Sequence, residues 1–132
     1  AMDSAKKHFM KFKYVMDIIE FIPAQQIPQV IKNCQLLVNA SPVGMKEGDG
    51  SIIDKNLLHN SLSVYDLVYN RDTQLIKDAR ASRLRQHSGL GMLLHQGVEA
   101  FEKWTNRSAS MMTVITMKDA LLEELKSAGI NN

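Results

Sequence analysis

The sequence predicts an α/β protein in which parallel strands are joined by helical crossovers. Short runs of branched and aromatic residues alternate along the chain with segments of helical character. The run Cys34–Val38 is almost entirely apolar and only five residues long, which is typical of a strand covered on both faces. The chain also closes with two segments whose apolar residues recur at helical spacing.

The first third of the chain predicts a helix, a strand and a short second helix. Asp3 to Phe12 is charged and free of Gly and Pro, which favours a helix. Tyr14–Ile19 is rich in branched and aromatic residues and predicts a strand. Pro28 suits the first turn of a short helix that runs to about Asn33. The Cys34–Val38 strand follows it.

The middle third predicts a long loop and two more strands around a helix. Asn39 to Asp54 contains four Gly and Pro residues, and loops of this length in small domains are often functional. Leu62–Tyr69 predicts a strand, and Thr73 can cap a helix that reaches about Ser82. Leu84–His87 predicts a short final strand.

Two amphipathic helices are predicted at the end. The stripe of the first is Leu90, Leu93, Leu94, Gly97, Val98, Phe101 and Trp104. Val114, Met117, Leu121 and Leu125 form the stripe of the second, which Gly129 is expected to end.

Composition excludes several classes of protein. The 132 residues suit a single domain, and their net charge of +2 is too small to indicate nucleic-acid or membrane-surface binding. A single cysteine, Cys34, excludes an intramolecular disulfide framework, and the four histidines show no metal-ligand spacing. No apolar run approaches the ~20 residues that cross a bilayer. Because we find no signal-peptide pattern, we expect a cytoplasmic protein. The cysteine count and the histidine spacing lead us to expect no metal site.

Three motifs stand at places where ligands bind. Asn39–Met45 leaves the carboxyl end of a predicted strand, and Tyr65–Tyr69 ends a second strand at the same edge. Gln96 lies on the apolar flank of a helix that starts with Gly89-Leu90-Gly91, and a buried amide would need partners. The Gly-Leu-Gly run alone is an incomplete dinucleotide fingerprint, since Leu94 stands where a third Gly belongs. Each motif also has a purely structural interpretation: a turn, an aromatic strand end and a helix surface residue.

Together and in this order, the motifs resemble the shikimate dehydrogenase family. The matching segments are Leu37–Met45 (LVNASPVGM), Val64–Asn70 (VYDLVYN) and Gly89–Gly97 (GLGMLLHQG), with Glu99-Ala100-Phe101 and Trp104-Thr105 extending the last. The resemblance implies a partial Rossmann-like fold, a doubly wound parallel sheet that lacks its first two strands. Residues 1–132 would be the C-terminal portion of the NADP-binding domain, with closing helices over 89–128.

The family reduces 3-dehydroshikimate reversibly to shikimate with NADPH, so the resemblance implies NADP as cofactor, with NAD not excluded. By resemblance, Tyr69 and Gln96 contact the substrate through a hydroxyl and an amide. The positions implied for the cofactor are Ala40, Ser41, Leu67, Gly89 and Met92.

The family's catalytic Lys and Asp lie in an N-terminal substrate domain that has no counterpart in these residues, so no catalytic residue is expected in this chain. We therefore expect a fragment that is inactive alone and works with its missing half, or that self-associates through open sheet edges. The alternative is a non-catalytic remnant or interaction module that retains part of the fold.

Overall fold

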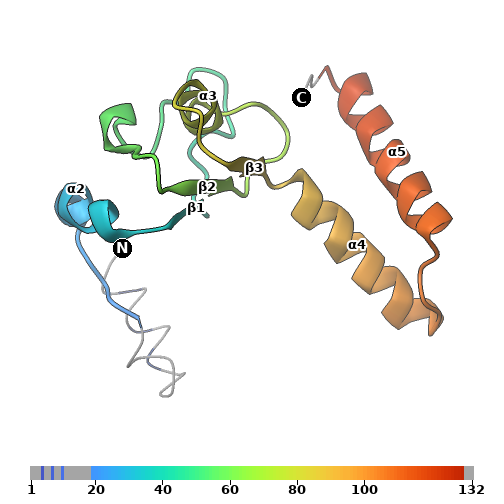
Figure 1. The fold of residues 1–132 in the computed structure, drawn as a ribbon. Coiled ribbons are helices and arrows are strands. Elements are labelled where there is room, and N and C mark those ends of the chain that lie inside the picture. The colour runs from blue at the N-terminus through green and yellow to red at the C-terminus, as the bar shows by residue number, and fades with distance from the viewer. Residues whose placement is uncertain (1–3, 5–6, 8–9, 11–18, 130–132) are drawn as a thin grey trace. The chain divides into compact units, whose positions relative to one another are not determined.

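The computed structural model describes residues 4, 7, 10 and 19–129, which form two compact units divided after Cys34 (Figure 1). The predicted helix Asp3–Phe12 falls outside the described residues except at three positions. The predicted strand Tyr14–Ile19 also lies outside them, apart from Ile19. The described helices include none that is long and apolar enough to cross a membrane.

Over the described stretch 19–34, the first unit contains a short helical segment in three parts. A 3-10 turn, η2 (Ala24–Gln26), leads into α2 (Ile27–Val30), which carries Pro28 in its first turn as predicted. A second 3-10 turn, η3 (Ile31–Asn33), ends where the backbone N–H of Cys34 donates to the carbonyl of Ile31 at 3.0 Å. Cys34 therefore caps a helix, and the strand that we expected to begin there starts two residues later.

The second unit is built on a three-stranded parallel sheet in the order β1-β2-β3. The strands are β1 (Leu36–Asn39), β2 (Ser63–Asp66) and β3 (Gln86–Ser88). In this register Asn39 stands beside Asp66, and Asp66 beside Ser88, so the carboxyl ends of all three strands meet at one edge. The predicted parallel α/β arrangement is confirmed.

One helix lies over the sheet, and the core of the unit is beneath it. α3 (Gln74–Ala81) packs against β2 and β3 (Figure 1). The buried apolar side chains on this side are Leu62, Val64, Leu75, Ile76, Ala79 and Leu84. The 3-10 turn that follows the long loop, η4 (Lys55–Leu57), also packs against α3.

The expectation that the strand at Cys34–Val38 is covered on both faces is wrong. Leu36 is 57% exposed and Val38 47%, while the alternate residue Asn39 is 2% exposed. Successive residues of a strand point to opposite faces, so β1 buries one face and leaves the other open in this structure. An apolar run shows that both faces of a strand suit burial. It does not show that a second element packs on the other face.

Two long helices close the chain, α4 (Leu90–Thr105) and α5 (Met111–Ser127), and they pack against each other. Asn106 adopts a left-handed conformation after α4, and Ser110 caps α5 by accepting from the N–H of Thr113 at 3.1 Å. Gly97 faces Met117 across the pair: a Cβ on Gly97 would lie 3.3 Å from the Met117 Cε. Gly129 has a φ of +76° just after α5, as the sequence predicts. Trp104, which we placed in the apolar stripe, is 86% exposed.

Candidate functional site

A cavity of about 180 Å³ opens at the carboxyl edge of the sheet, between the loops that follow β1 and β2. The residues that line it are Ala40, Ser41, Met45, Leu67, Val68, Tyr69 and Asn70. The wall is mostly apolar, with a hydroxyl from Ser41, a phenol from Tyr69 and an amide from Asn70. Such a mixture suits a small ligand that is partly planar and carries a few polar groups.

The loop on one side of the cavity is shaped by Asn39, the last residue of β1. Its Oδ1 accepts from the Ser41 backbone N–H at 3.0 Å and from the Ser41 hydroxyl at 2.7 Å. Its Nδ2 donates to the carbonyl of Val43 at 3.0 Å. One buried amide side chain thus folds the chain into a turn, and the turn fixes where Ser41 stands on the cavity wall.

Asp66, the last residue of β2, connects this turn to the next two segments. It is fully buried, and its Oδ1 accepts from Asn39 Nδ2 at 3.0 Å and from the Val68 backbone N–H at 3.1 Å. Its Oδ2 accepts from the Thr73 hydroxyl at 2.6 Å. A buried carboxylate needs such donors, since an unpaired one would be strongly destabilising.

The same carboxylate explains why the predicted strand Leu62–Tyr69 is too long. The side chain of Asp66 takes the N–H of Val68, which in a continued strand would be free for the ladder. The last ladder bond runs from the Leu67 N–H to the Asn39 carbonyl at 3.0 Å. β2 therefore ends at Asp66, and Leu67, Val68 and Tyr69 turn to line the cavity instead.

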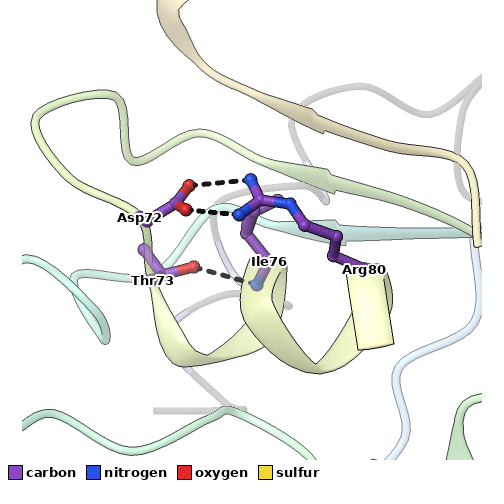
Figure 2. Close-up of polar contacts among 4 residues, drawn as sticks. All are labelled: Asp72, Thr73, Ile76 and Arg80. Atoms are coloured by element: carbon purple, nitrogen blue, oxygen red, sulfur yellow. Dashed lines mark hydrogen bonds and ion pairs between the residues drawn. The ribbon is translucent and has the colours of Figure 1, made fainter. Parts of the chain in front are cut away.

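Thr73 joins the site to α3, because its hydroxyl donates to Asp66 and also caps the helix. Figure 2 shows the bond to Ile76 and the neighbouring contacts of Asp72 with Arg80. Thr73 caps the helix by accepting from the Ile76 N–H at 3.2 Å, as the sequence predicts, and it is buried to 3% exposure. Beside it, Asp72 forms a two-pronged ion pair with Arg80, at 2.7 and 3.2 Å. Asp72 holds the pKa of Arg80 above its ordinary value through this hydrogen bond and its charge. The start of α3 is therefore fixed from two sides.

Asp49 closes a turn at residues 44–49 of the loop that follows β1. Its Oδ2 accepts from the backbone N–H groups of Lys46, at 3.0 Å, and Gly44, at 2.9 Å. These two hydrogen bonds, helped by the charges of Lys46 and Arg71, hold the pKa of Asp49 below its ordinary value of 3.8. Gly44 has a φ of +100°, and a Cβ there would lie 2.8 Å from the Thr73 Cγ2. Only glycine suits this position, where the loop packs directly on the cap of α3.

Gly89, which follows β3, lies at the same carboxyl edge and contacts the segment after β2. Its N–H donates to the carbonyl of Val68 at 3.2 Å, and its own carbonyl accepts from Leu93 in the first turn of α4. A Cβ on Gly89 would lie 2.6 Å from the carbonyl carbon of Leu67. The start of α4 is thus in direct contact with the segment that lines the cavity.

Comparison with known proteins agrees with this architecture. The family model of the shikimate 5'-dehydrogenase C-terminal domain matches residues 89–122. A shikimate dehydrogenase (NADP+) of Methanopyrus kandleri is 37% identical over 108 residues, which cover 80% of this chain and 36% of that protein. One of Methanothrix thermoacetophila is 36% identical over 87 residues, covering 66% of this chain and 32% of that protein.

Solved structures lead to the same family. The crystal structure of shikimate dehydrogenase from Aquifex aeolicus matches 89% of this chain and 41% of its own, with a TM-score of 0.74 and 29% identity. The chain belongs to the shikimate dehydrogenase family, of which it matches the C-terminal part. A quinate dehydrogenase from Corynebacterium glutamicum, solved with NAD, gives a TM-score of 0.70 at 33% identity, over 77% of this chain and 36% of that one. The chain spans about a third of the length of the curated shikimate dehydrogenases that it matches.

The structure brings most of the residues implied by the shikimate dehydrogenase resemblance to one place. Ala40, Ser41, Leu67 and Tyr69 all line the cavity, and Gly89 closely approaches the backbone of Leu67. Two others lie apart from it.

Met92, 41% exposed, and Gln96, also exposed, lie on α4 and do not line the cavity. Of the two interpretations of Gln96 left open by the sequence, a buried amide or a helix surface residue, the structure agrees with the second, and no residue of α4 is buried.

The sequence reasoning missed the buried Asn39–Asp66 pair. Asn39 directly follows the predicted strand Cys34–Val38, and Asp66 is a charged residue inside the predicted strand Leu62–Tyr69. These two polar residues beside apolar ones were the available signal. Among the residues that the structure describes, no group of three His, Cys, Asp or Glu is placed to hold a metal ion.

Proposed function

We propose that this chain is the C-terminal part of the NADP-binding domain of a shikimate dehydrogenase, with 89–128 as its closing helices. In this proposal it supplies the nicotinamide end of the cofactor site and one wall of the substrate site. The observation that carries it is the cavity at the carboxyl edge of the sheet. Four positions implied by the family meet in its wall, two from the loop after β1 and two from the segment after β2: Ala40, Ser41, Leu67 and Tyr69.

The cavity wall fits the nicotinamide end of a dinucleotide. Leu67, Val68 and Ala40 offer an apolar surface to a flat ring, and Ser41 and Asn70 offer groups that can bond its carboxamide. Gly89 lets the backbone come close at the same edge. When bound, the cofactor accepts or returns the hydride, and these residues orient it and exclude water. Solved relatives include a shikimate dehydrogenase in complex with NADP+.

Substrate contacts are assigned to Tyr69 and Gln96. Tyr69 is 39% exposed at the mouth of the cavity, where its hydroxyl can bond a polyhydroxylated ring. Gln96 stands on the exposed side of α4, with Met92 one turn before it. Both groups are suited to a shikimate-like hydroxy acid, the ligand in a solved relative from Listeria monocytogenes.

The proton transfer that accompanies hydride transfer needs a general acid or base. Among the residues that the structure describes, no Lys, Asp, Glu or His lines the cavity. We therefore place the acid and base outside the cavity residues described here, in another segment or a second polypeptide, and expect the 132 residues alone to be inactive. Edge strand β1 could receive a strand from that segment, or from a second copy of this chain.

The test is nicotinamide reduction by shikimate and NADP+, followed by absorbance, for the chain alone and with the N-terminal half of a related shikimate dehydrogenase. We expect no turnover alone and turnover on completion. Quinate and NAD+ are parallel arms, because a relative is a quinate dehydrogenase solved with NAD. Turnover by the chain alone would overturn the completion proposal. Binding of neither cofactor nor substrate after completion would favour a non-catalytic remnant.

Association is tested separately by light scattering. A compact monomer near the chain mass of 14.9 kDa that unfolds cooperatively would argue against pairing at the β1 edge.

A further inference from the structure

We infer that Asp66 is a positioning residue for the cavity: its buried carboxylate holds the loop after β1, the segment after β2 and the start of α3 in the relative placement that ligand binding requires. The inference deepens the proposed function and rests on it for the identity of the ligands. Asp66 itself does not line the cavity, so its effect must act through the segments that it binds.

The three donors to Asp66 come from three different segments. Asn39 Nδ2 belongs to the end of β1, the Val68 N–H to the segment after β2, and the Thr73 hydroxyl to the cap of α3. A side chain with no exposed surface that accepts all three is a single junction. An apolar residue could fill this space without the cost of burying a carboxylate, but it could not bond the three segments.

Each bond reaches a cavity wall within a few residues. Asn39, held by Asp66 through its Nδ2, in turn holds Ser41, because its Oδ1 accepts from the Ser41 hydroxyl at 2.7 Å. The bonded N–H of Val68 lies between Leu67 and Tyr69, so it sets the direction of that wall directly.

Thr73 completes the frame on the third side. Its methyl group packs where a Cβ on Gly44 would lie, one residue from the cavity residue Met45. The loop after β1 and the segment after β2 are therefore both bonded to the Asp66 carboxylate. The loop after β1 also packs on Thr73, the cap of α3. Misplacing such a wall by about 1 Å can cost as much as ~100-fold in rate.

Three variants separate positioning from stability in the completed, full-length protein. Asp66→Asn keeps the shape but presents N–H groups in place of one oxygen. The Thr73 hydroxyl loses its acceptor if the amide nitrogen replaces Oδ2, and Asn39 and Val68 lose theirs if it replaces Oδ1. Thr73→Val removes the hydroxyl with little change of volume, and Thr73→Ser restores it. Ile76→Val is the matched control, since Ile76 is 1% exposed on the same helix and its side chain takes no part in these bonds.

We expect Asp66→Asn and Thr73→Val to lower kcat/KM for shikimate and NADP+ about tenfold per folded molecule, largely through raised KM values. Thr73→Ser should stay near the wild type, and Ile76→Val should lower the melting temperature without moving either KM. Equal kcat/KM values for Asp66→Asn, Thr73→Val and Ile76→Val would overturn the inference and leave Asp66 a merely structural residue.

Amide hydrogen exchange keeps the test independent of activity. Asp66→Asn should lose protection selectively at residues 40–45 and 67–70, whereas Ile76→Val should lose it evenly over the unit. Absence of wild-type turnover with either substrate, together with this selective loss, would refute the proposed function and retain the positioning role. Uniform loss in Asp66→Asn would refute the positioning role whatever the activity.

Discussion

Gly89 and Leu67 approach so closely that no other residue fits at position 89. A Cβ there would lie 3.1 Å from the Leu67 Cα and 2.6 Å from its carbonyl carbon. These are backbone atoms of the segment that ends β2, so they cannot move aside as the end of a flexible side chain could. The contact connects the start of α4 to the wall of the cavity.

Gly89→Ala should therefore destabilise the protein, by about 1–3 kcal/mol, as the backbone around Leu67 shifts. Gly91→Ala is the matched control two residues along the same segment, because a Cβ on Gly91 meets nothing within 4 Å. In a helix that substitution should stabilise by about 0.5–1 kcal/mol. Urea unfolding of both variants measures the difference. Similar effects at the two positions would show that the close approach to Leu67 does not exist.

The helices were predictable because their signals are local. Thr73 stands three residues before the N–H that it caps, and Gly129 ends α5 through its own φ of +76°. Strand ends were not predictable in this way. β2 ends early because the Asp66 carboxylate takes the Val68 N–H, and the carboxylate is placed by donors up to 27 residues away in sequence. Such pairing is invisible until the fold brings the segments together.

Some residues of the candidate site were likewise predictable from the sequence, and others were not. Ala40, Ser41, Leu67 and Tyr69 could be named from the sequence because the segments that carry them resemble those of shikimate dehydrogenases. The structure places all four in the wall of one cavity. The buried pair Asn39 and Asp66, which shapes that wall, could not be named from the sequence. Its importance depends on the parallel register that sets the two residues side by side.

Asn39→Ala tests the turn that carries Ser41. The substitution removes a donor to Asp66 and Val43 and an acceptor for Ser41, and it leaves buried polar groups without partners. We expect a loss of about 1–3 kcal/mol in the free energy of unfolding. Asn60→Ala, at an exposed turn position, should change it by no more than about 0.5 kcal/mol. Chemical denaturation compares the two variants. Equal losses of stability would show that the hydrogen bonds of Asn39 do not hold the turn beside the cavity.

The loop around Asp49 should respond to acid. Because hydrogen bonds from Lys46 and Gly44 lower the pKa of Asp49 below 3.8, the ionised form stabilises the folded loop. That contribution is complete above the ordinary pKa and is lost as the pH falls through the lowered one. An NMR titration should show the amide signals of both residues moving together with a midpoint below 3.8. Asp49→Asn should abolish this movement; a midpoint at or above 3.8 in the wild type would contradict the hydrogen bonds.

Tyr69→Phe tests the proposed substrate contact in the completed protein. Removing the hydroxyl at the mouth of the cavity should raise the KM for shikimate about tenfold, the value of one hydrogen bond, and leave the KM for NADP+ nearly unchanged. Tyr65→Phe is the control: Tyr65 lies on β2 with its ring centroid 6.2 Å from that of His87, and it does not line the cavity. Steady-state kinetics with both substrates separates the two tyrosines. If Tyr65→Phe raises the KM for shikimate as much as Tyr69→Phe does, the hydroxyl of Tyr69 has no special place in substrate binding, because a shared effect would then come from the Tyr65–Tyr69 segment that carries them both.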